Sequence, residues 1–309
     1  MPDVPSIESA ILFEGPWTHR TVRANGIAMH IAEVGAGPLV LFLHGFPQFW
    51  WTWRDQLGEL ADAGFRAVAV DLRGIGASDK PPRGYDTPTL ANDVAALVAA
   101  LGERDAMLVG NDLGGLIAWT VAAQHPRVAR RLAVVGAAHP LRLRQAVATE
   151  PRTQGSASAY AWRTFQVPRR PEALLTRDAA YVGELFERWS GPKWRDTPSF
   201  VEDVDVYARA LRVPKVAHTS LEQFRWLVRS QARPDGRRFA ARLREPITAP
   251  VLQLHGADDR CVLPATAQGS GRYVSAEYEW RLIDGVGHYP QNETPDVVSG
   301  QLIRWAKQG

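Results

Sequence analysis

The chain has 309 residues, of which 45% are hydrophobic, and its 36 basic and 33 acidic side chains give a formal net charge of +3. This length and apolar content can bury a large core and favour either one domain with an insertion or two domains. The charge is small, and the sequence contains no lysine run or mixed basic and aromatic tract, so no nucleic-acid partner is expected.

Targeting signals and cysteine usage indicate the compartment. The first residues, MPDVPSIESAILFEGPW, contain prolines and acidic side chains where a secretory signal needs a basic start and an apolar core. No run of roughly 18 apolar residues occurs, so no membrane partner is expected. The single cysteine, Cys261, has no second cysteine for a disulfide or a cysteine metal site. These features predict a protein of the reducing cytoplasm.

The first part of the chain alternates between strand and helix patterns, which favours a mostly parallel sheet covered by helices. We expect strands at residues 20–24, 28–34, 39–43, 67–70, 106–109 and 132–135. The helices expected between these strands cover residues 51–63, 87–101 and 116–124.

The pattern changes at residues 139–246, where strand patterns stop and arginine and aromatic residues become frequent. Amphipathic periods in this segment predict helices, among them 203–211 and 220–229. Strand patterns return at 250–255 and 278–283, and a helical period follows at 297–307. We therefore expect an α/β core domain of residues 1–138 and 247–309, interrupted by a helical cap (lid) domain at 139–246, with the active site between the two.

The motif GNDLGG at residues 110–115 stands at a predicted turn from strand to helix. Such a turn strains the backbone of its central residue, here Asp112, and leaves little room for neighbouring side chains. Gly110, Gly114 and Gly115 leave that room. Because a carboxylate is ionised at neutral pH and can attack carbon directly, we expect Asp112 to be a nucleophile for alkyl transfer. In the alternative interpretation, Asp112 only caps the next helix.

The ester that Asp112 would form needs a base for its hydrolysis. His288 follows the predicted strand 278–283 through a glycine-containing turn, which places it at the carboxyl edge of the sheet. An imidazole base also needs a carboxylate partner. Two neighbouring acids, Asp258 and Asp259, follow the strand at 250–255; we favour Asp259, and the choice between them stays open.

Another place for this acid, after the strand at 132–135, is excluded because residues 136–145 contain no Asp or Glu.

Backbone N–H groups are needed to stabilise the oxyanion of ester hydrolysis. We expect them from Leu113, directly after the nucleophile, and from Phe46 in the HGFP motif, which on its own could also be an ordinary tight turn. No metal or organic cofactor is implied, since these groups supply the whole mechanism.

Five motifs occur in order along the chain: HGFPQFWWTW, DLRGIGASDKP, GNDLGG, HGADD and GVGHYPQNETP. Together they resemble the epoxide hydrolases of the α/β-hydrolase fold, above all the actinobacterial members, from about residue 20 onward. The resemblance implies an aspartate nucleophile at Asp112, a triad completed by His288 and Asp259, and an oxyanion hole of the Phe46 and Leu113 N–H groups. The substrate would be a small apolar epoxide, opened to a vicinal diol.

Opening an epoxide leaves an alkoxide that must be protonated, and in the family two lid tyrosines supply the proton. Tyr160 is the nearest match to the first. Phe224 stands where the second is expected and cannot donate a proton, which leaves Tyr207 or His218 as candidate replacements. The residues expected to line the substrate pocket are Phe46, Trp162, Phe224 and Tyr289.

Two alternatives stay open. A haloalkane or other dehalogenase would use the same triad with a halide that leaves without a proton, although Leu113 stands where haloalkane dehalogenases carry a tryptophan. A catalytically silent binding protein of the same fold is the second alternative. The sequence determines neither the physiological substrate nor the stereochemistry, and it leaves a homodimer open.

Overall fold

The computed structural model describes residues 11–177 and 179–308. Its core is one eight-stranded sheet with the strand order β1-β2-β4-β3-β5-β6-β7-β8. The pairs β1–β2 and β2–β4 are antiparallel, and all the remaining pairs are parallel. The strands are β1 (Thr18–Ala24), β2 (Ile27–Val34), β3 (Leu39–Leu43), β4 (Arg66–Val70), β5 (Ala106–Asn111), β6 (Ala129–Val135), β7 (Val251–Gly256) and β8 (Tyr278–Ile283). The predicted mostly parallel α/β sheet is confirmed.

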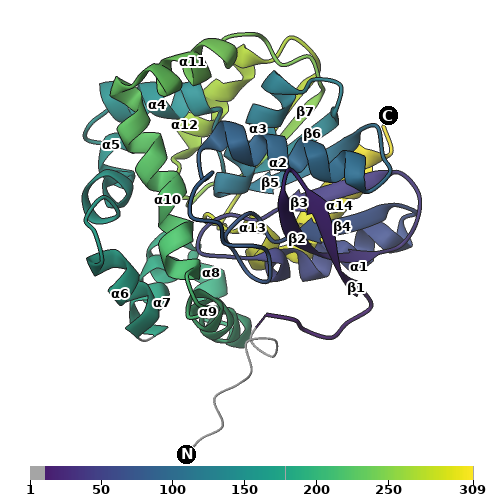
Figure 1. Ribbon diagram of the computed structural model, residues 1–309, viewed down its shortest axis with the longest axis horizontal. Coiled ribbons are helices and arrows are strands. Elements are labelled where there is room, and N and C mark those ends of the chain that lie inside the picture. Colours follow the sequence, from purple (N-terminus) through teal and green to yellow (C-terminus); the bar gives the residue numbers. More distant parts are fainter. Residues whose placement is uncertain (1–10, 178, 309) are drawn as a thin grey trace, which may run out of the picture.

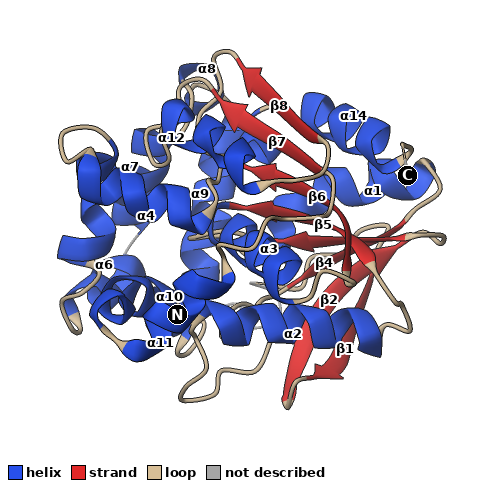
Figure 2. Ribbon diagram, turned by 90° about the horizontal axis from the view of Figure 1, so that it is seen from above, coloured by secondary structure: helices blue, strands red, loops and turns tan. Residues whose placement is uncertain are grey.

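Helices cover both faces of this sheet (Figure 2). Helices α1 (Arg54–Asp62) and α14 (Pro295–Ala306) pack on one face, and α2 (Thr87–Ala100) and α3 (Asp112–Gln124) on the other. The sequence of strand β3, LVLFL, is apolar throughout, and all five of its residues are buried. Val40 and Phe42 join the cluster that contains α1, whereas Leu41 joins the cluster that contains α2, so successive side chains are buried on opposite faces.

A long helical segment separates β6 from β7 and lies beside the carboxyl end of the sheet (Figure 1). We call residues 140–242 the helical insert. Its helices are α4 (Pro140–Thr149), α5 (Gln154–Ala157), α6 (Arg170–Arg177), α7 (Ala179–Trp189), α8 (Pro192–Arg195), α9 (Pro198–Leu211), α10 (Val216–Arg229) and α11 (Pro234–Arg242). A π-helical turn, Tyr160–Thr164, lies between α5 and α6.

A 3₁₀ turn (Ser230–Ala232) lies between α10 and α11, and the remaining short elements follow β7 or precede α1. Helix α12 (Pro264–Gln268) and a 3₁₀ turn (Gly269–Tyr273) come after β7, and α13 (Pro290–Glu293) comes after β8. A 3₁₀ turn (Trp50–Trp53) begins the segment predicted as one helix at 51–63. Within the described ranges, no helix has the length and apolar character that crossing a membrane requires.

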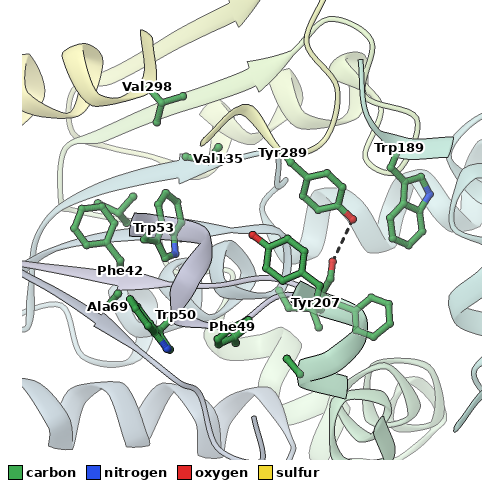
Figure 3. Packing of buried hydrophobic residues seen from close by; sticks show 14 of the residues in the cluster. Phe42, Phe49, Trp50, Trp53, Ala69, Val135, Trp189, Tyr207, Tyr289 and Val298 are labelled. Atoms are coloured by element: carbon green, nitrogen blue, oxygen red, sulfur yellow. Dashed lines mark hydrogen bonds between the residues drawn. The ribbon is translucent and has the colours of Figure 1, made fainter. Parts of the chain in front are cut away.

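A cluster of fully buried aromatic side chains joins the sheet to the helical insert (Figure 3). Phe49 and Trp50 come from the segment between β3 and α1, and Tyr207 comes from α9 of the insert. The ring of Tyr207 stacks on Phe186 of α7, and Phe186 stacks in turn on Tyr289. Because buried aromatic rings contribute large apolar areas, this cluster fixes the insert on the core.

Candidate active site

Asp112 lies at the sharp turn between β5 and α3, with a positive φ of 48°. The strand ends at Asn111 and the helix begins at the next residue, four positions earlier than predicted, because no loop separates the two. A Cβ on Gly114 would lie 2.2 Å from the carbonyl oxygen of Leu43, and a Cβ on Gly45 would lie 2.6 Å from the Cβ of Asp112. The glycines therefore permit a strained backbone that lifts the Asp112 side chain out of the sheet edge.

The two carboxylate oxygens of Asp112 have different surroundings. Oδ2 accepts a hydrogen bond of 3.0 Å from the backbone N–H of Phe46. Oδ1 lies 3.6 Å from Nε2 of His288, which is beyond hydrogen-bond distance. One oxygen is thus held by the loop after β3, while the other faces the imidazole.

His288 is held from its other side by Asp259. Nδ1 of the imidazole donates to Oδ2 of Asp259 at 2.8 Å, and Oδ1 of Asp259 accepts the backbone N–H groups of Cys261 and Val262 at 2.8 and 2.9 Å. Asp258 is exposed, so Asp259 is the acid in contact with His288. Burial lowers the pKa of His288, but Asp259, Cys261 and Asp112 together outweigh burial, and the pKa lies well above its usual value.

The loop that carries His288 is fixed by a residue that sequence reasoning missed, Glu293. Its carboxylate accepts the backbone N–H groups of Gly287 and Tyr289, at 2.8 and 3.1 Å, and also that of Gly191 in the insert, at 2.8 Å. The N–H of His288 itself donates to the carbonyl of Trp189 at 2.8 Å. The position of His288 therefore depends on contacts with both the core and the insert.

A cavity of about 580 Å³ opens beside Asp112. Asp112 and Leu113 form its floor, and apolar side chains of α4, α10 and α11 form much of its wall. Of the expected pocket residues, Trp162 and Phe224 line this cavity. Such a mostly apolar space with a few polar groups is typical of a small-molecule site.

Tyr160 also lines the cavity, at the start of the π-helical turn. Its hydroxyl lies 3.2 Å from Sγ of Cys261, and its ring contacts Phe165, Trp189 and Phe224. Burial raises the pKa of Tyr160 well above its usual value, so the hydroxyl keeps its proton at neutral pH.

The other residues predicted around the substrate lie outside the cavity wall. The hydroxyl of Tyr207 accepts the Asn292 amide at 3.1 Å within a polar cluster between α9 and the core. The Tyr289 hydroxyl donates to the carbonyl of Phe46 at 3.4 Å (Figure 3). Neither Tyr289 nor Phe46 lines the cavity. His218 is exposed and contacts Glu172 on the insert surface.

Cys261 was not recognised in the sequence as part of this region. It lies two residues after Asp259, so the same turn that brings Asp259 to His288 brings the thiol to the cavity wall. Burial raises the pKa of this thiol above its usual value. The spacing Asp-x-Cys was the only local signal, and it has meaning only once the role of Asp259 is known.

Comparison with known proteins agrees with this architecture. Residues 38–295 match the family model described as the alpha/beta hydrolase fold. Epoxide hydrolase 4 of Mus musculus is 30% identical over 301 residues, which cover 94% of this chain and 80% of that protein.

Two solved structures of epoxide hydrolases are also similar. The enzyme VrEH1 from Vigna radiata is 28% identical with a TM-score of 0.80, and the match covers 95% of this chain and 98% of that one. Epoxide hydrolase A from the actinobacterium Mycobacterium thermoresistibile is 25% identical with a TM-score of 0.78, and the match covers 94% of this chain and 98% of that one. The expected resemblance to epoxide hydrolases is confirmed, and the chain belongs to the α/β-hydrolase fold family as an epoxide-hydrolase-like member.

Proposed function

We propose that this protein is an epoxide hydrolase, which opens a small apolar epoxide to a vicinal diol through a covalent ester on Asp112. The observation that carries the proposal is the cavity wall, where the Asp112 carboxylate and the protonated Tyr160 hydroxyl stand beside the same apolar space. An epoxide needs these two groups together, a nucleophile for carbon and a proton for oxygen. Similarity to proteins named epoxide hydrolases supports the same activity.

In the first half of the reaction, an Asp112 oxygen attacks one epoxide carbon and the bond from that carbon to the ring oxygen breaks. The alkoxide that forms takes the proton of the Tyr160 hydroxyl. We assign the attack to Oδ1, because the Phe46 N–H already holds Oδ2 where the oxyanion of the next step develops. The Leu113 N–H is the second proposed donor of that oxyanion hole.

In the second half, the ester no longer carries the Asp112 charge that helps to raise the pKa of His288, so the imidazole can release its proton to solvent. Neutral His288 then removes a proton from water, and the resulting hydroxide attacks the carbonyl carbon of the ester. Asp259, hydrogen-bonded to Nδ1, stabilises the imidazolium and keeps Nε2 directed at the ester. When the tetrahedral intermediate collapses, the diol leaves with the proton held by His288, and Asp112 remains as a carboxylic acid. This acid loses its proton to solvent, which restores the carboxylate. Tyr160 regains its proton from solvent.

We further propose that residues 139–246 form a cap domain over a core domain of residues 1–138 and 247–309. The cavity supports this division, since its floor comes from α3 and much of its wall from α4, α10 and α11. We assign the protein to the reducing cytoplasm on its cysteine usage alone.

A covalent intermediate is the test of this function. We expect that a His288→Gln variant incubated with styrene oxide gains the mass of one styrene oxide on the peptide that contains Asp112, because the ester forms and is not hydrolysed. The wild-type protein should release the diol and show little adduct. The matched control is Asp112→Asn, which should show neither adduct nor turnover.

Failure of the wild-type protein to turn over epoxides, together with no adduct in His288→Gln, contradicts the proposal. Chloride or bromide release from haloalkanes in that case identifies a dehalogenase with the same triad. Inactivity toward both substrate classes favours a silent member of the fold that acts in binding.

A further inference from the structure

Three side chains of different chemistry converge at the floor of the cavity. A carboxylate oxygen of Asp112, Sγ of Cys261 and a ring nitrogen of His288 all lie within 4.8 Å of one another. The three residues are 7%, 2% and 0% exposed. Oxygen, thiolate sulfur and imidazole nitrogen are together the donor set of borderline-soft divalent cations such as Zn²⁺.

The imidazole nitrogen of His288 that belongs to this cluster is Nε2. Nε2 of His288 is buried and has no hydrogen-bond partner among the residues that the structure describes, and it lies 3.6 Å from Oδ1 of Asp112. In a tetrahedral zinc site, bonds of about 2.0–2.2 Å place neighbouring N and O ligands roughly 3.3–3.6 Å apart. The separation is therefore too long for a hydrogen bond and suits two ligands of one cation.

Each ligand is also oriented by a second group, as in stable metal sites. Asp259 holds Nδ1 of His288 at 2.8 Å, which leaves Nε2 free to point at the cation. The Phe46 N–H holds Oδ2 of Asp112, which leaves Oδ1 free. The Tyr160 hydroxyl lies 3.2 Å from Sγ of Cys261 and can donate to the thiolate.

A cation can reach these ligands from the cavity. Asp112 and Cys261 both line it, so water or a substrate atom from the cavity can take the fourth coordination position. Binding a cation displaces the thiol proton from Sγ and the proton that the imidazolium carries on Nε2, and both protons pass to solvent.

We propose that Asp112, Cys261 and His288 form a reversible binding site for Zn²⁺ and related thiophilic divalent cations, and that a bound cation inhibits the enzyme. Inhibition follows because the cation occupies Oδ1 of Asp112 and Nε2 of His288, which the proposed reaction uses as nucleophile and base. The cation is thus an inhibitor and takes no part in the reaction. The inhibitory effect rests on the proposed function, whereas the binding site does not.

Cadmium binding tests the site independently of catalysis. We expect Cd²⁺ added to the wild-type protein to produce the ultraviolet charge-transfer band of a cadmium thiolate at one equivalent, since the chain has a single cysteine. Cys261→Ser should lose this band and bind Zn²⁺ at least tenfold more weakly by calorimetry. His288→Gln should keep the thiol and also bind at least tenfold more weakly.

Activity gives the second readout, with each variant compared with its own metal-free rate. Zn²⁺ should inhibit styrene oxide turnover by the wild-type protein and EDTA should restore it, while inhibition of Cys261→Ser should need at least tenfold more Zn²⁺. A His218→Gln variant is the matched control for an exposed histidine near carboxylates, and it should bind Zn²⁺ as the wild type does.

A missing cadmium thiolate band, or equal Zn²⁺ affinity in the wild-type protein and Cys261→Ser, overturns the proposal. If the protein turns over no epoxide, the cadmium band and the calorimetry still decide whether the site exists. A band and a Cys261-dependent affinity without any epoxide turnover support the site and contradict only the proposed function.

Discussion

At the scale of single residues, the proposed ring opening depends on Tyr160, because Phe224 at the same cavity offers no proton. We predict that Tyr160→Phe lowers epoxide turnover at least tenfold, since general acid catalysis typically contributes ~10² to 10⁴ in rate. Steady-state rates with styrene oxide measure this. Tyr181→Phe in α7 is the matched control, because Tyr181 lies in the insert but outside the cavity wall, and it should leave the rate unchanged. An unchanged rate in Tyr160→Phe removes this residue from the mechanism.

The neighbouring acids Asp258 and Asp259 give a second test at this scale. Asp259→Asn should slow hydrolysis of the ester by up to ~10⁴-fold, because the amide no longer stabilises the imidazolium of His288. The ester should still form, so the measurement is decay of the Asp112 adduct after a single turnover. Asp258→Asn is the control, since Asp258 is exposed. Similar decay in the two variants contradicts the assignment of Asp259.

At the scale of elements, the turn from β5 to α3 depends on the absence of a side chain at Gly114. A Cβ there would lie 2.2 Å from the carbonyl oxygen of Leu43 and 2.6 Å from that of His44. Because both neighbours are backbone atoms, we predict that Gly114→Ala lowers the free energy of unfolding by ~1–3 kcal/mol. Urea unfolding measures the loss, and activity should fall with it.

The control for this change is Gly58→Ala in α1, where a Cβ would meet nothing within 4 Å. Alanine costs less backbone entropy than glycine in a helix, so this variant should gain ~0.5–1 kcal/mol. Equal stability changes in the two variants would mean that a side chain at position 114 costs no stability through its contact with the backbone of Leu43 and His44.

Elements of this kind are the part of the molecule that sequence predicts well. The apolar run at 39–43 and the glycines of the GNDLGG motif follow local rules of burial and backbone sterics. The structure has β3 and the turn at Asp112 where these rules place them. The start of α3 was missed by four residues because helical periodicity does not reveal that strand and helix join without a loop. Local sequence patterns therefore predict which element forms, but they do not predict the residue at which it meets the next element.

At the scale of the whole molecule, contacts between core and insert could not be predicted, because they join residues far apart in the chain. Asn292 of α13 donates to Asp203 of α9 at 2.9 Å and accepts the Thr52 hydroxyl at 2.7 Å. None of these three residues has a local sequence pattern that identifies its partner. The same holds for Glu293, whose carboxylate accepts the N–H of Gly191, and for Cys261, whose thiol meets Tyr160.

An ion pair between Arg54 of α1 and Asp203 of α9 also joins the core to the insert. Nη2 of Arg54 lies 3.1 Å from Oδ1 of Asp203, which is 3% exposed. Burial raises the pKa of Asp203, and Arg54 opposes that shift only in part. Arg54→Met leaves the carboxylate without its cation, so we predict a loss of roughly 3 kcal/mol in the free energy of unfolding at neutral pH, near the low end for a buried pair because Arg54 keeps some solvent contact.

The second variant, Arg54→Met combined with Asp203→Asn, should regain at least ~1 kcal/mol of this loss, because it removes the unpaired charge and keeps the hydrogen bond from Asn292. An acid with a raised folded-state pKa destabilises the folded protein when it is ionised, and the penalty shrinks as the pH falls through that pKa. The deficit of Arg54→Met should therefore be largest at neutral pH and diminish on acidification, whereas that of the double variant should stay nearly constant. Urea titrations at several pH values measure the free energy of unfolding of both variants. A double variant less stable than Arg54→Met at every pH would contradict a stabilising role for the charge of Arg54 beside Asp203.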